Sequence, residues 1–464
     1  MLVFRSPTDK IIMDRGKRHL IPSVLTLPYM MLPSNYLKIY PYNEAHNQLL
    51  LFSTRLSSKI LVKKETWKAM EKCLLSHEDK TVLQKLGMLV EDRDEEKRAV
   101  SGVFEELNKK NTTIDIIVVL NLDCNFACKY CFEGNMKGHI YMSEGTAAKL
   151  IDFIRKRFTE DKRVLHLDFY GGEPLLSLGL IREISGQLNQ FAKERNASFD
   201  FGLVTNGALF KKETAEELAR LGLKNVKITL DGPSHIHNKN RPFKSGLGSF
   251  ETIISNIKET CNLASIAVGG NFERDNYREF PLLVDYLINE GLTPDKIAQV
   301  KFDPVMKRSD RVLSPMDFRD GCMSLNEPWL IEASLFLREE ILKRGYRTPG
   351  IKPLFCVVES ANSYVVNYDG VIYKCPGFIG MKGFEAGDVE NGLNDYSSSY
   401  GLGSWKNEQC MECAYLPLCF GGCRLIKFMR DENIDSTECQ REYLDACLET
   451  LVKQDIKYGL RADK

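Results

Sequence analysis

Three cysteines lie close together in the segment LNLDCNFACKYCFEG (residues 120–134): Cys124, Cys128 and Cys131, with the spacing C-x3-C-x2-C. Cysteine thiolates are the usual ligands of iron–sulfur clusters, most often four to a cluster. The next cysteine along the chain is Cys261, so a cubane cluster on this loop would have one iron without a local protein ligand. Such an iron can bind a cofactor or a substrate. A zinc site is the alternative, but zinc motifs usually combine two C-x2-C pairs.

An aromatic residue, Tyr130, stands directly before the third cysteine, where it can shield a cluster or touch a bound cofactor. With this residue the motif resembles the signature of the radical SAM enzymes. The resemblance implies that the open iron binds the amino and carboxylate groups of S-adenosylmethionine (SAM). It also implies that reductive cleavage of SAM yields a 5′-deoxyadenosyl radical, which abstracts hydrogen from a substrate. In such enzymes the cofactor carries the chemistry and the protein positions it.

The composition narrows the class of protein. Lys plus Arg and Asp plus Glu both number 63, and the resulting zero net charge argues against a globally basic nucleic-acid binder. Fourteen cysteines in 464 residues favour metal binding over a small secreted disulfide scaffold. The apolar run at 20–32 is too short for a membrane span, contains prolines, and is not followed by an A-x-A-like cleavage site. We expect a cytoplasmic protein without a membrane partner.

The first hundred residues predict a small separate domain. We expect a weakly ordered extension over 1–35, then a domain over 36–100 with an antiparallel hairpin, two helices at 63–75 and 77–87, and a closing strand. This order resembles a winged helix and is similar to the recognition domains fused to many peptide-modifying enzymes. Those domains add the strand of a leader peptide to a sheet edge. A DNA-binding winged helix and a simple packing domain remain alternatives.

Strands and helices then alternate over 112–310. Alternation of this kind predicts an α/β fold with a parallel sheet. The six units match the partial (β/α)6 TIM-like barrel that the radical SAM resemblance implies, with its chemistry at the carboxyl ends of the strands. The predicted strands are 113–122, 163–172, 198–207, 225–232, 264–272 and 296–305.

Polar and glycine residues follow these strands. The second strand ends in YGGEP, whose glycines permit close backbone approach and whose Glu173 can accept from an ammonium group. The resemblance implies that this motif contacts the SAM amino group, and that the polar residues after the third and fourth strands lie near the SAM ribose and carboxylate. The cofactor candidates implied in this way are Gly171, Gly172, Glu173, Thr205, Asn206 and Asp231.

Three further residues are candidates for binding or catalysis. Arg241 matches an arginine found after the fourth strand in related peptide maturases, although a structural salt bridge explains it equally well. Asn271 holds a similar position on the fifth strand, as a further cofactor candidate. Cys322 lies in a predicted helical bridge over 311–350 and is the first candidate for a catalytic hydrogen donor.

The tail over 351–447 is rich in cysteine. Its pattern, C-x13-G-x4-C followed by C-x2-C-x5-C-x3-C and one more cysteine, resembles the SPASM extension of radical SAM enzymes. The resemblance implies two auxiliary [4Fe–4S] clusters, hence three clusters in all; a pair of zinc ribbons is the alternative. The implied ligands are Cys356, Cys375 and Cys423 for the first auxiliary cluster, and Cys410, Cys413, Cys419 and Cys439 for the second.

The first of these ligand sets has only three cysteines. Cys322, Cys447 or a substrate thiolate could supply the fourth ligand. Asp369-Gly370 predicts the turn of a β-hairpin that frames Cys375. Residues 448–464 are expected to form a C-terminal helix or tail.

Together these features resemble the geopeptide-type radical SAM maturases of ribosomally made peptides. The resemblance implies a precursor peptide with a leader, a ferredoxin or flavodoxin as reductant, and formation of a thioether or carbon–carbon cross-link, with epimerisation as another outcome. An anaerobic sulfatase-maturing enzyme is the alternative enzyme. That group has an Asp after the second tail cysteine, where this chain has Pro376. A redox-sensing DNA-binding protein is the alternative of another class, and it would not need the strand-end motifs.

Overall fold

The computed structural model describes residues 3–4, 31–72, 74–131, 133–305 and 328–459. Cys322 and most of the predicted bridge lie outside the described residues. None of the helices in the described ranges is long and apolar enough to cross a membrane.

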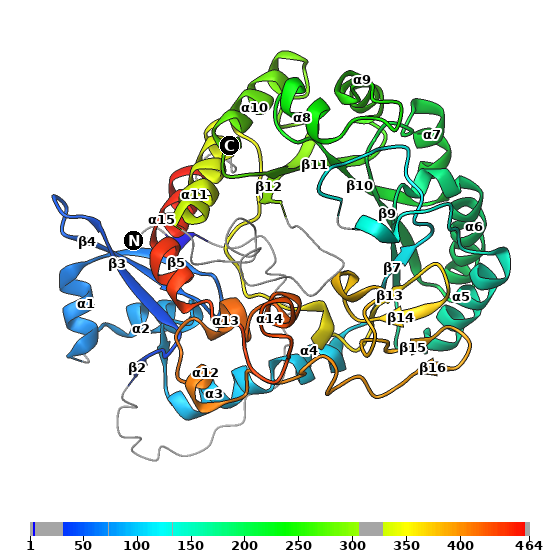
Figure 1. Cartoon of the computed structure of the whole chain (residues 1–464). Coiled ribbons are helices and arrows are strands. Elements are labelled where there is room, and N and C mark those ends of the chain that lie inside the picture. The colour runs from blue at the N-terminus through cyan, green and yellow to red at the C-terminus, as the bar shows by residue number, and fades with distance from the viewer. Residues whose placement is uncertain (1–2, 5–30, 73, 132, 306–327, 460–464) are drawn as a thin grey trace.

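Six parallel strands form the centre of the molecule, as the sequence predicts. They lie side by side in chain order, and each of the first five is followed by a helical connection on the outer side of the curved sheet (Figure 1). A partial (β/α)6 barrel is therefore confirmed. The strands are β7 (Thr113–Val119), β8 (Val164–Tyr170), β9 (Ser198–Thr205), β10 (Leu223–Thr229), β11 (Ser265–Phe272) and β12 (Ile297–Pro304). The helices are α5 (Glu144–Arg157), α6 (Leu178–Glu194), α7 (Lys212–Leu221), α8 (Ser234–Asn240), α9 (Phe250–Thr260) and α10 (Phe280–Asn289).

The alternation of side chains along β8 explains how the barrel is built. Leu165, Leu167 and Phe169 are buried in the core formed with the surrounding helices. Successive side chains of a strand point to opposite faces, so His166 and Asp168 face the inside of the barrel. The helices are set by local signals as well: the side chain of Ser143 accepts from the backbone N–H of Thr146 and caps α5, as predicted.

The cysteine-rich tail is joined to the barrel sheet, which the sequence did not predict. The expected hairpin is present: β13 (Ser363–Val366) and β14 (Val371–Tyr373) are antiparallel and turn at Gly370, whose φ is 88°. However, β13 also pairs in parallel with β7. Two short strands, β15 (Gly387–Asp388) and β16 (Gly392–Leu393), extend the sheet further. The first barrel strand, which leads into the cysteine loop, thus lies between β8 and the tail.

The N-terminal region contains the predicted hairpin and helices. An antiparallel sheet has the order β1-β5-β4-β3, and it is followed by two helices. Two short strands fall in the segment expected to be weakly ordered: β1 pairs with β5, and β2 pairs with β6, so the predicted closing strand does not join the main sheet. The elements are β1 (Val3–Phe4), β2 (Leu32–Pro33), β3 (Leu37–Asn43), β4 (Gln48–Ser53), β5 (Lys59–Lys63), α1 (Lys64–Glu71), α2 (His77–Lys85), β6 (Leu89–Val90), α3 (Arg93–Ser101) and α4 (Val103–Lys110).

The N-terminal sheet packs on the tail. Leu50 and Phe52 of β4 share a core with Tyr415 and with apolar residues of the last helix. That helix, α15 (Arg441–Gly459), begins inside the predicted tail domain and lies against α11 (Pro328–Lys343). The hydroxyl of Thr54 also donates to the carbonyl of Ala414, at 2.6 Å. Three short helices complete the tail: α12 (Glu408–Met411), α13 (Leu416–Cys419) and α14 (Arg424–Asp431).

Candidate active site and cysteine groups

The first cysteine loop leaves the carboxyl end of β7. Cys124 is buried, which raises its pKa to about 11, and its sulfur accepts from the backbone N–H of Phe126 at 3.4 Å. Burial alone would lower the pKa of Lys137, but the neighbouring thiols of Cys131, Cys124 and Cys128 raise it. All three thiols of the loop therefore act on one cation. This donor set fits a cluster with three protein ligands.

The two glycines of the YGGEP motif let the end of β8 approach the backbone that leads into this loop. Gly172 N–H donates to Asn121 O at 2.9 Å, and Glu173 N–H donates to Asp123 O at 2.8 Å. A Cβ atom on Gly171 would lie 2.5 Å from Asn121 O, and one on Gly172 would lie 2.0 Å from Asp123 O. The close approach seen in the structure is thus to the protein's own backbone, and it fixes the residue before Cys124.

Gly172→Ala is therefore expected to displace the cysteine loop. The added methyl meets backbone, which cannot swing away, and overpacking of this kind costs about 1–3 kcal/mol. Urea unfolding and iron content after anaerobic reconstitution measure the effect. Gly179→Ala is the matched control, because Gly179 lies on α6 with nothing within 4 Å of a Cβ, where alanine favours the helix. Equal stability and equal iron in the two variants would contradict the expectation.

Glu173 is buried, and its carboxylate accepts three hydrogen bonds from other residues of the chain. Its carboxylate accepts from Leu175 N–H at 3.0 Å, from the Thr205 hydroxyl at 2.8 Å and from Asn206 N–H at 2.8 Å. The amide of Asn206 donates to Asn125 Oδ1 at 2.7 Å and lies 3.7 Å from the sulfur of Cys124. Glu173 thus joins the ends of β8 and β9 to the cysteine loop, and its contact with SAM stays a prediction.

The four remaining described candidates form one polar network. The hydroxyl of Tyr130 donates to the buried carboxylate of Asp231 and accepts from Arg241 Nη1 at 3.0 Å. It also accepts from the side-chain amide of Asn271 at 3.2 Å, and the backbone N–H of Asn271 donates to Asp231 at 2.9 Å. The network connects the cysteine loop to the carboxyl ends of β10 and β11. Sequence position alone had placed these residues after separate strands.

Sequence reasoning missed two charged groups beside the loop. Glu133 is buried, its Oε2 has no hydrogen-bond partner among the described residues, and burial raises its pKa to about 7. Lys137 is the cation that the three thiols share. Both lie within six residues of Cys131 in the sequence, which is the signal that could have found them.

The tail cysteines form two groups in the structure, and their role as cluster ligands stays a prediction. Cys410, Cys413, Cys419 and Cys439 line one pocket, together with Thr437. Cys356 and Cys423 are the thiols that act electrostatically on Cys375, whose pKa burial raises to about 12. Cys447 is buried on α15 with Tyr443 as its side-chain partner, and its part as a fourth ligand stays a hypothesis.

A buried ion pair links two segments of the tail group formed by Cys356, Cys375 and Cys423, which we call the three-cysteine group. Arg424 Nη2 lies 2.6 Å from Glu359 Oε1, and their side chains are 4% and 7% exposed. Glu359 also accepts from Gly403 N–H at 3.2 Å and from Trp405 Nε1 at 3.1 Å. Glu359 follows Cys356 by three residues and Arg424 follows Cys423 directly, so the pair holds both cysteine segments in place.

A cluster of charges lines the inside of the barrel, nearer the amino ends of the strands. His166 Nδ1 contacts Asp200, and Nε2 lies 3.5 Å from Asp168. Ligand atoms of Asp115, His166 and Asp168 lie within 4.8 Å of one another. Gly202 leaves room for Asp168, because a Cβ there would be 2.1 Å from its carboxylate. Since carboxylates already engage both imidazole nitrogens, we interpret the cluster as an ion-pair network.

The His166 network predicts pH-dependent stability. Its hydrogen bond to Asp168, opposed by burial, raises the pKa of His166 from 6.5 to about 9. The contribution is therefore complete below pH 6.5 and is lost as the pH rises through 9. It amounts to about 2–3 kcal/mol. Urea unfolding of wild type should lose this free energy between pH 6.5 and 9.5, whereas His166→Gln should lack that loss. Parallel pH profiles for the two proteins would contradict the assignment.

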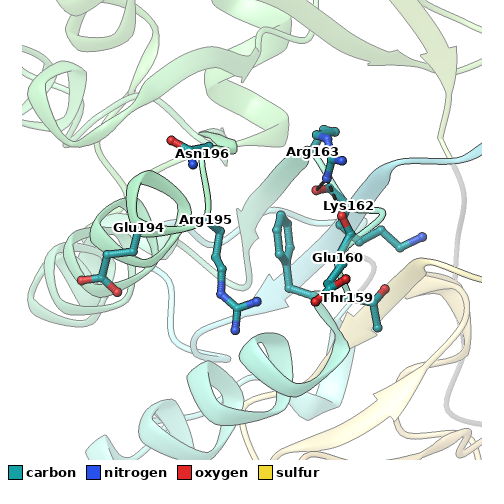
Figure 2. Close-up of a pocket in the computed structure, with 8 residues that line it drawn as sticks. Thr159, Glu160, Lys162, Arg163, Glu194, Arg195 and Asn196 are labelled. Carbon is teal, nitrogen blue, oxygen red and sulfur yellow. Dashed lines mark hydrogen bonds between the residues drawn. The ribbon is translucent and has the colours of Figure 1, made fainter.

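A separate pocket lies at the opposite end of the strands from the cysteine loop. It opens between the turn before β8 and the turn before β9 (Figure 2). Lys162 and Arg163 come from the first turn, and Arg195 and Asn196 come from the second. The cations from the first turn are satisfied locally, since Lys162 Nζ donates to Asn111 O at 2.9 Å and Arg163 Nη1 donates to Lys162 O at 2.7 Å. We assign no role in the chemistry to this pocket.

Comparison with known proteins agrees with this geometry. The radical SAM superfamily matches residues 118–279. The radical SAM cyclopropyl synthase TigE of Paramaledivibacter caminithermalis is 23% identical over 357 residues, covering 71% of each chain. A cysteine-type anaerobic sulfatase-maturating enzyme of Clostridium novyi is 25% identical over 334 residues, 65% of this chain and 85% of that one. The structure of native anSMEcpe with bound AdoMet and Cp18Cys peptide matches with a TM-score of 0.57 and 17% identity, covering 75% of this chain and 98% of that chain.

The fold and the site define an α/β partial barrel with a cluster-type cysteine loop at the carboxyl end of its first strand. The chain carries a radical SAM domain over residues 118–279. It is an enzyme of the SPASM-maturase type, related to peptide modifiers and to sulfatase-maturating enzymes. Members of the superfamily bind a [4Fe–4S] cluster and SAM. The alternative of a redox-sensing DNA-binding protein is not supported.

Proposed function

We propose that this protein is an oxidoreductase that modifies a ribosomally made precursor peptide, forming a thioether or carbon–carbon cross-link. The observation that carries the proposal is the joining of three cysteine groups in one fold. One group lies on the barrel loop, and two lie in a tail that pairs with the same barrel sheet. Epimerisation is the alternative modification. The name of TigE as a cyclopropyl synthase supports carbon-centred chemistry.

The proposed roles of the residues follow from their places. Cys124, Cys128 and Cys131 hold the cluster that binds SAM, and the ends of β8 and β9 orient the loop through Glu173 and Asn206. The network around Tyr130 and Asp231 forms the neighbouring wall of the site, where its polar groups can position SAM. When bound, the cluster and SAM supply a 5′-deoxyadenosyl radical, which can remove a hydrogen atom from the peptide.

Arg241 is the proposed catalytic or positioning cation. Its guanidinium donates to Tyr130 and acts electrostatically on Cys128, so it lies between the SAM wall and the cysteine loop. Its Nε has no partner among the described residues. A buried donor without a partner is costly. Arg241 is thus available to a carboxylate of SAM or of the substrate. Cys322, the predicted hydrogen donor, stays a hypothesis because it lies outside the described residues.

We propose two auxiliary [4Fe–4S] clusters, held by the three-cysteine and four-cysteine groups of the tail. The N-terminal domain is proposed to bind the leader of the peptide by strand addition. Its contact with the four-cysteine segment, through Thr54 and Ala414, would bring a bound leader close to the tail. A ferredoxin or flavodoxin is the proposed reductant, and a reducing cytoplasm is the proposed location.

The test uses candidate precursor peptides, chosen from any short open reading frames found next to this gene. Reconstituted protein, SAM and dithionite should yield 5′-deoxyadenosine and a peptide lighter by two hydrogen atoms, one taken by the radical and one lost as a proton with its electron. Epimerisation would leave the mass unchanged but incorporate deuterium from heavy water. A peptide that stays unmodified while 5′-deoxyadenosine forms would contradict the peptide substrate.

Sulfatase maturation is the second candidate, favoured by the names of the Clostridium novyi relative and of the structure bound to a cysteine peptide. It would oxidise a cysteine or serine to formylglycine. Cys375 is followed by Pro376, where the sulfatase-maturing group has an Asp, and this weighs against it. The same assay with a sulfatase-derived cysteine peptide separates the two, because formylglycine would then appear.

A further inference from the structure

A lysine is buried beside the three-cysteine group of the tail. Lys374 is 0% exposed and stands directly before Cys375. Its Nζ donates to the carbonyl of Ser360 at 2.6 Å and to the carbonyl of Ser363. The same nitrogen lies 4.8 Å from the centre of the Tyr364 ring and 5.0 Å from that of Tyr396. Carbonyl oxygens and ring faces accept only positive charge or donated hydrogens, so this cage is built for an ammonium group.

The cage provides no negative partner. Among the described residues, no carboxylate lies within 4.0 Å of Lys374 Nζ. A second cation, Arg157 of α5, acts electrostatically on Lys374, and its guanidinium donates to the hydroxyl of Tyr364 at 2.8 Å. A buried charge without a counter-charge costs several kcal/mol. Burial accordingly lowers the pKa of Lys374 to about 7, and a nearby anion is what would keep the ammonium form in this cage.

The three neighbouring cysteines would provide an anion if they held a cluster. Cys356 acts electrostatically on Lys374, and both Cys356 and Cys423 act electrostatically on Cys375. A [4Fe–4S]²⁺ core bound by three thiolates carries one net negative charge, and reduction adds another. Such a cluster would supply the missing counter-charge. Charge near a cluster is one of the features that set its reduction potential.

We propose that Lys374 is a positioning residue for the first auxiliary cluster: its caged ammonium group stabilises the reduced cluster and raises its reduction potential. The inference rests on the proposed function, since it needs a cluster on Cys356, Cys375 and Cys423. It assigns that cluster the part of electron acceptor when the peptide radical is oxidised. Among the tail cysteines, Cys356 is the one that acts on Lys374, so we expect the effect to be specific to the first auxiliary cluster.

The test is a potentiometric titration followed by EPR on the reconstituted full-length chain. Every protein in the test also has alanine in place of Cys124, Cys128 and Cys131, so that the auxiliary clusters are the only clusters that give a signal. The signal that Cys375→Ala removes identifies the first auxiliary cluster. Lys374→Met should lower its reduction equilibrium constant about tenfold, which is about 59 mV for a one-electron couple, and leave the second cluster unchanged. Lys374→Arg should retain most of the wild-type potential.

Lys427→Met is the matched control. Lys427 follows Cys423 by four residues, but Asp431 neutralises it at 2.5 Å, so its loss should leave the potential unchanged. An unchanged potential in Lys374→Met would overturn the inference, and so would equal shifts in Lys374→Met and Lys427→Met. Loss of about four irons in Lys374→Met alone, with retention in Lys374→Arg, would support it. Loss of the irons in both Lys374→Met and Lys374→Arg would show that Lys374 has a packing role and would overturn the inference. A wild-type protein without a Cys375-dependent cluster would overturn the proposed function, and this inference with it.

Discussion

Replacing Glu359 with glutamine is expected to destabilise the protein by about 3–5 kcal/mol. The substitution removes the only charge that contacts the guanidinium of Arg424 among the described residues, while the arginine stays buried at 4% exposure. The other contacts of Arg424 are to the backbone carbonyls of Phe420 and Gly422, both at 2.9 Å, and these cannot neutralise it. Urea unfolding measures the loss.

The same variant should lose the first auxiliary cluster. The ion pair connects the turn after Cys356 to the helix after Cys423, so its loss separates two of the three proposed ligands. Iron content should fall by about four per chain. Glu390→Gln is the control, because Glu390 pairs with Lys149 at the surface, where side chains are 64% and 53% exposed. Exposed pairs of this kind contribute at most about 1 kcal/mol. Full iron in Glu359→Gln would show that the ion pair does not position the cluster.

Asp231→Asn is expected to weaken both folding and SAM binding. The carboxylate accepts from Tyr130 and from the backbone of Asn271, and it is the negative group of a network that contains Arg241. Asparagine keeps the shape but removes the charge. Breaking a buried charge network in this way costs about 3 kcal/mol. Because Tyr130 and Arg241 would lose their fixed positions, SAM affinity should fall at least about tenfold.

Asp303→Asn provides the comparison for this variant. Asp303 lies opposite Asn271 in the register of β11 and β12, near the same end of the barrel, but its pair with Lys301 is partly exposed. Thermal unfolding and equilibrium dialysis of SAM should separate the two variants clearly. If Asp231→Asn unfolded at the wild-type temperature and bound SAM as tightly as wild type, the network would have neither role.

The barrel could be predicted because local signals agree with the fold. Each strand has an apolar face that alternates with polar residues or forms a buried run, and each helix has an apolar stripe and a recognisable start, such as Ser143 at α5. The cysteines of the barrel loop could also be anticipated, because their spacing is local, whereas the grouping of the tail cysteines followed from the resemblance to the SPASM extension. The pairing of strands from distant segments, such as β13 with β7, could not be predicted, because no residue near Ser363 specifies the partner strand.

The side-chain partners of the site were harder to predict. The sequence suggests that the Glu173 carboxylate binds a ligand. In the structure this carboxylate instead accepts hydrogen bonds from Thr205 and Asn206, at the end of the next strand. The pairing of Glu359 with Arg424 joins residues 65 positions apart, and no periodicity reveals it. Lys374 has an ordinary place in a strand-like segment, and only the structure shows that its ammonium group is caged and unpaired. Such contacts depend on tertiary packing.

The most direct test of the account is 5′-deoxyadenosine formation from SAM and dithionite, measured with iron content in the anaerobically reconstituted protein. Wild type should hold about twelve irons and cleave SAM. Replacing Cys124, Cys128 and Cys131 together by alanine should leave about eight irons and abolish cleavage. Bound zinc, or an iron-replete wild type that forms no 5′-deoxyadenosine, would contradict the assignment of radical SAM chemistry to this loop.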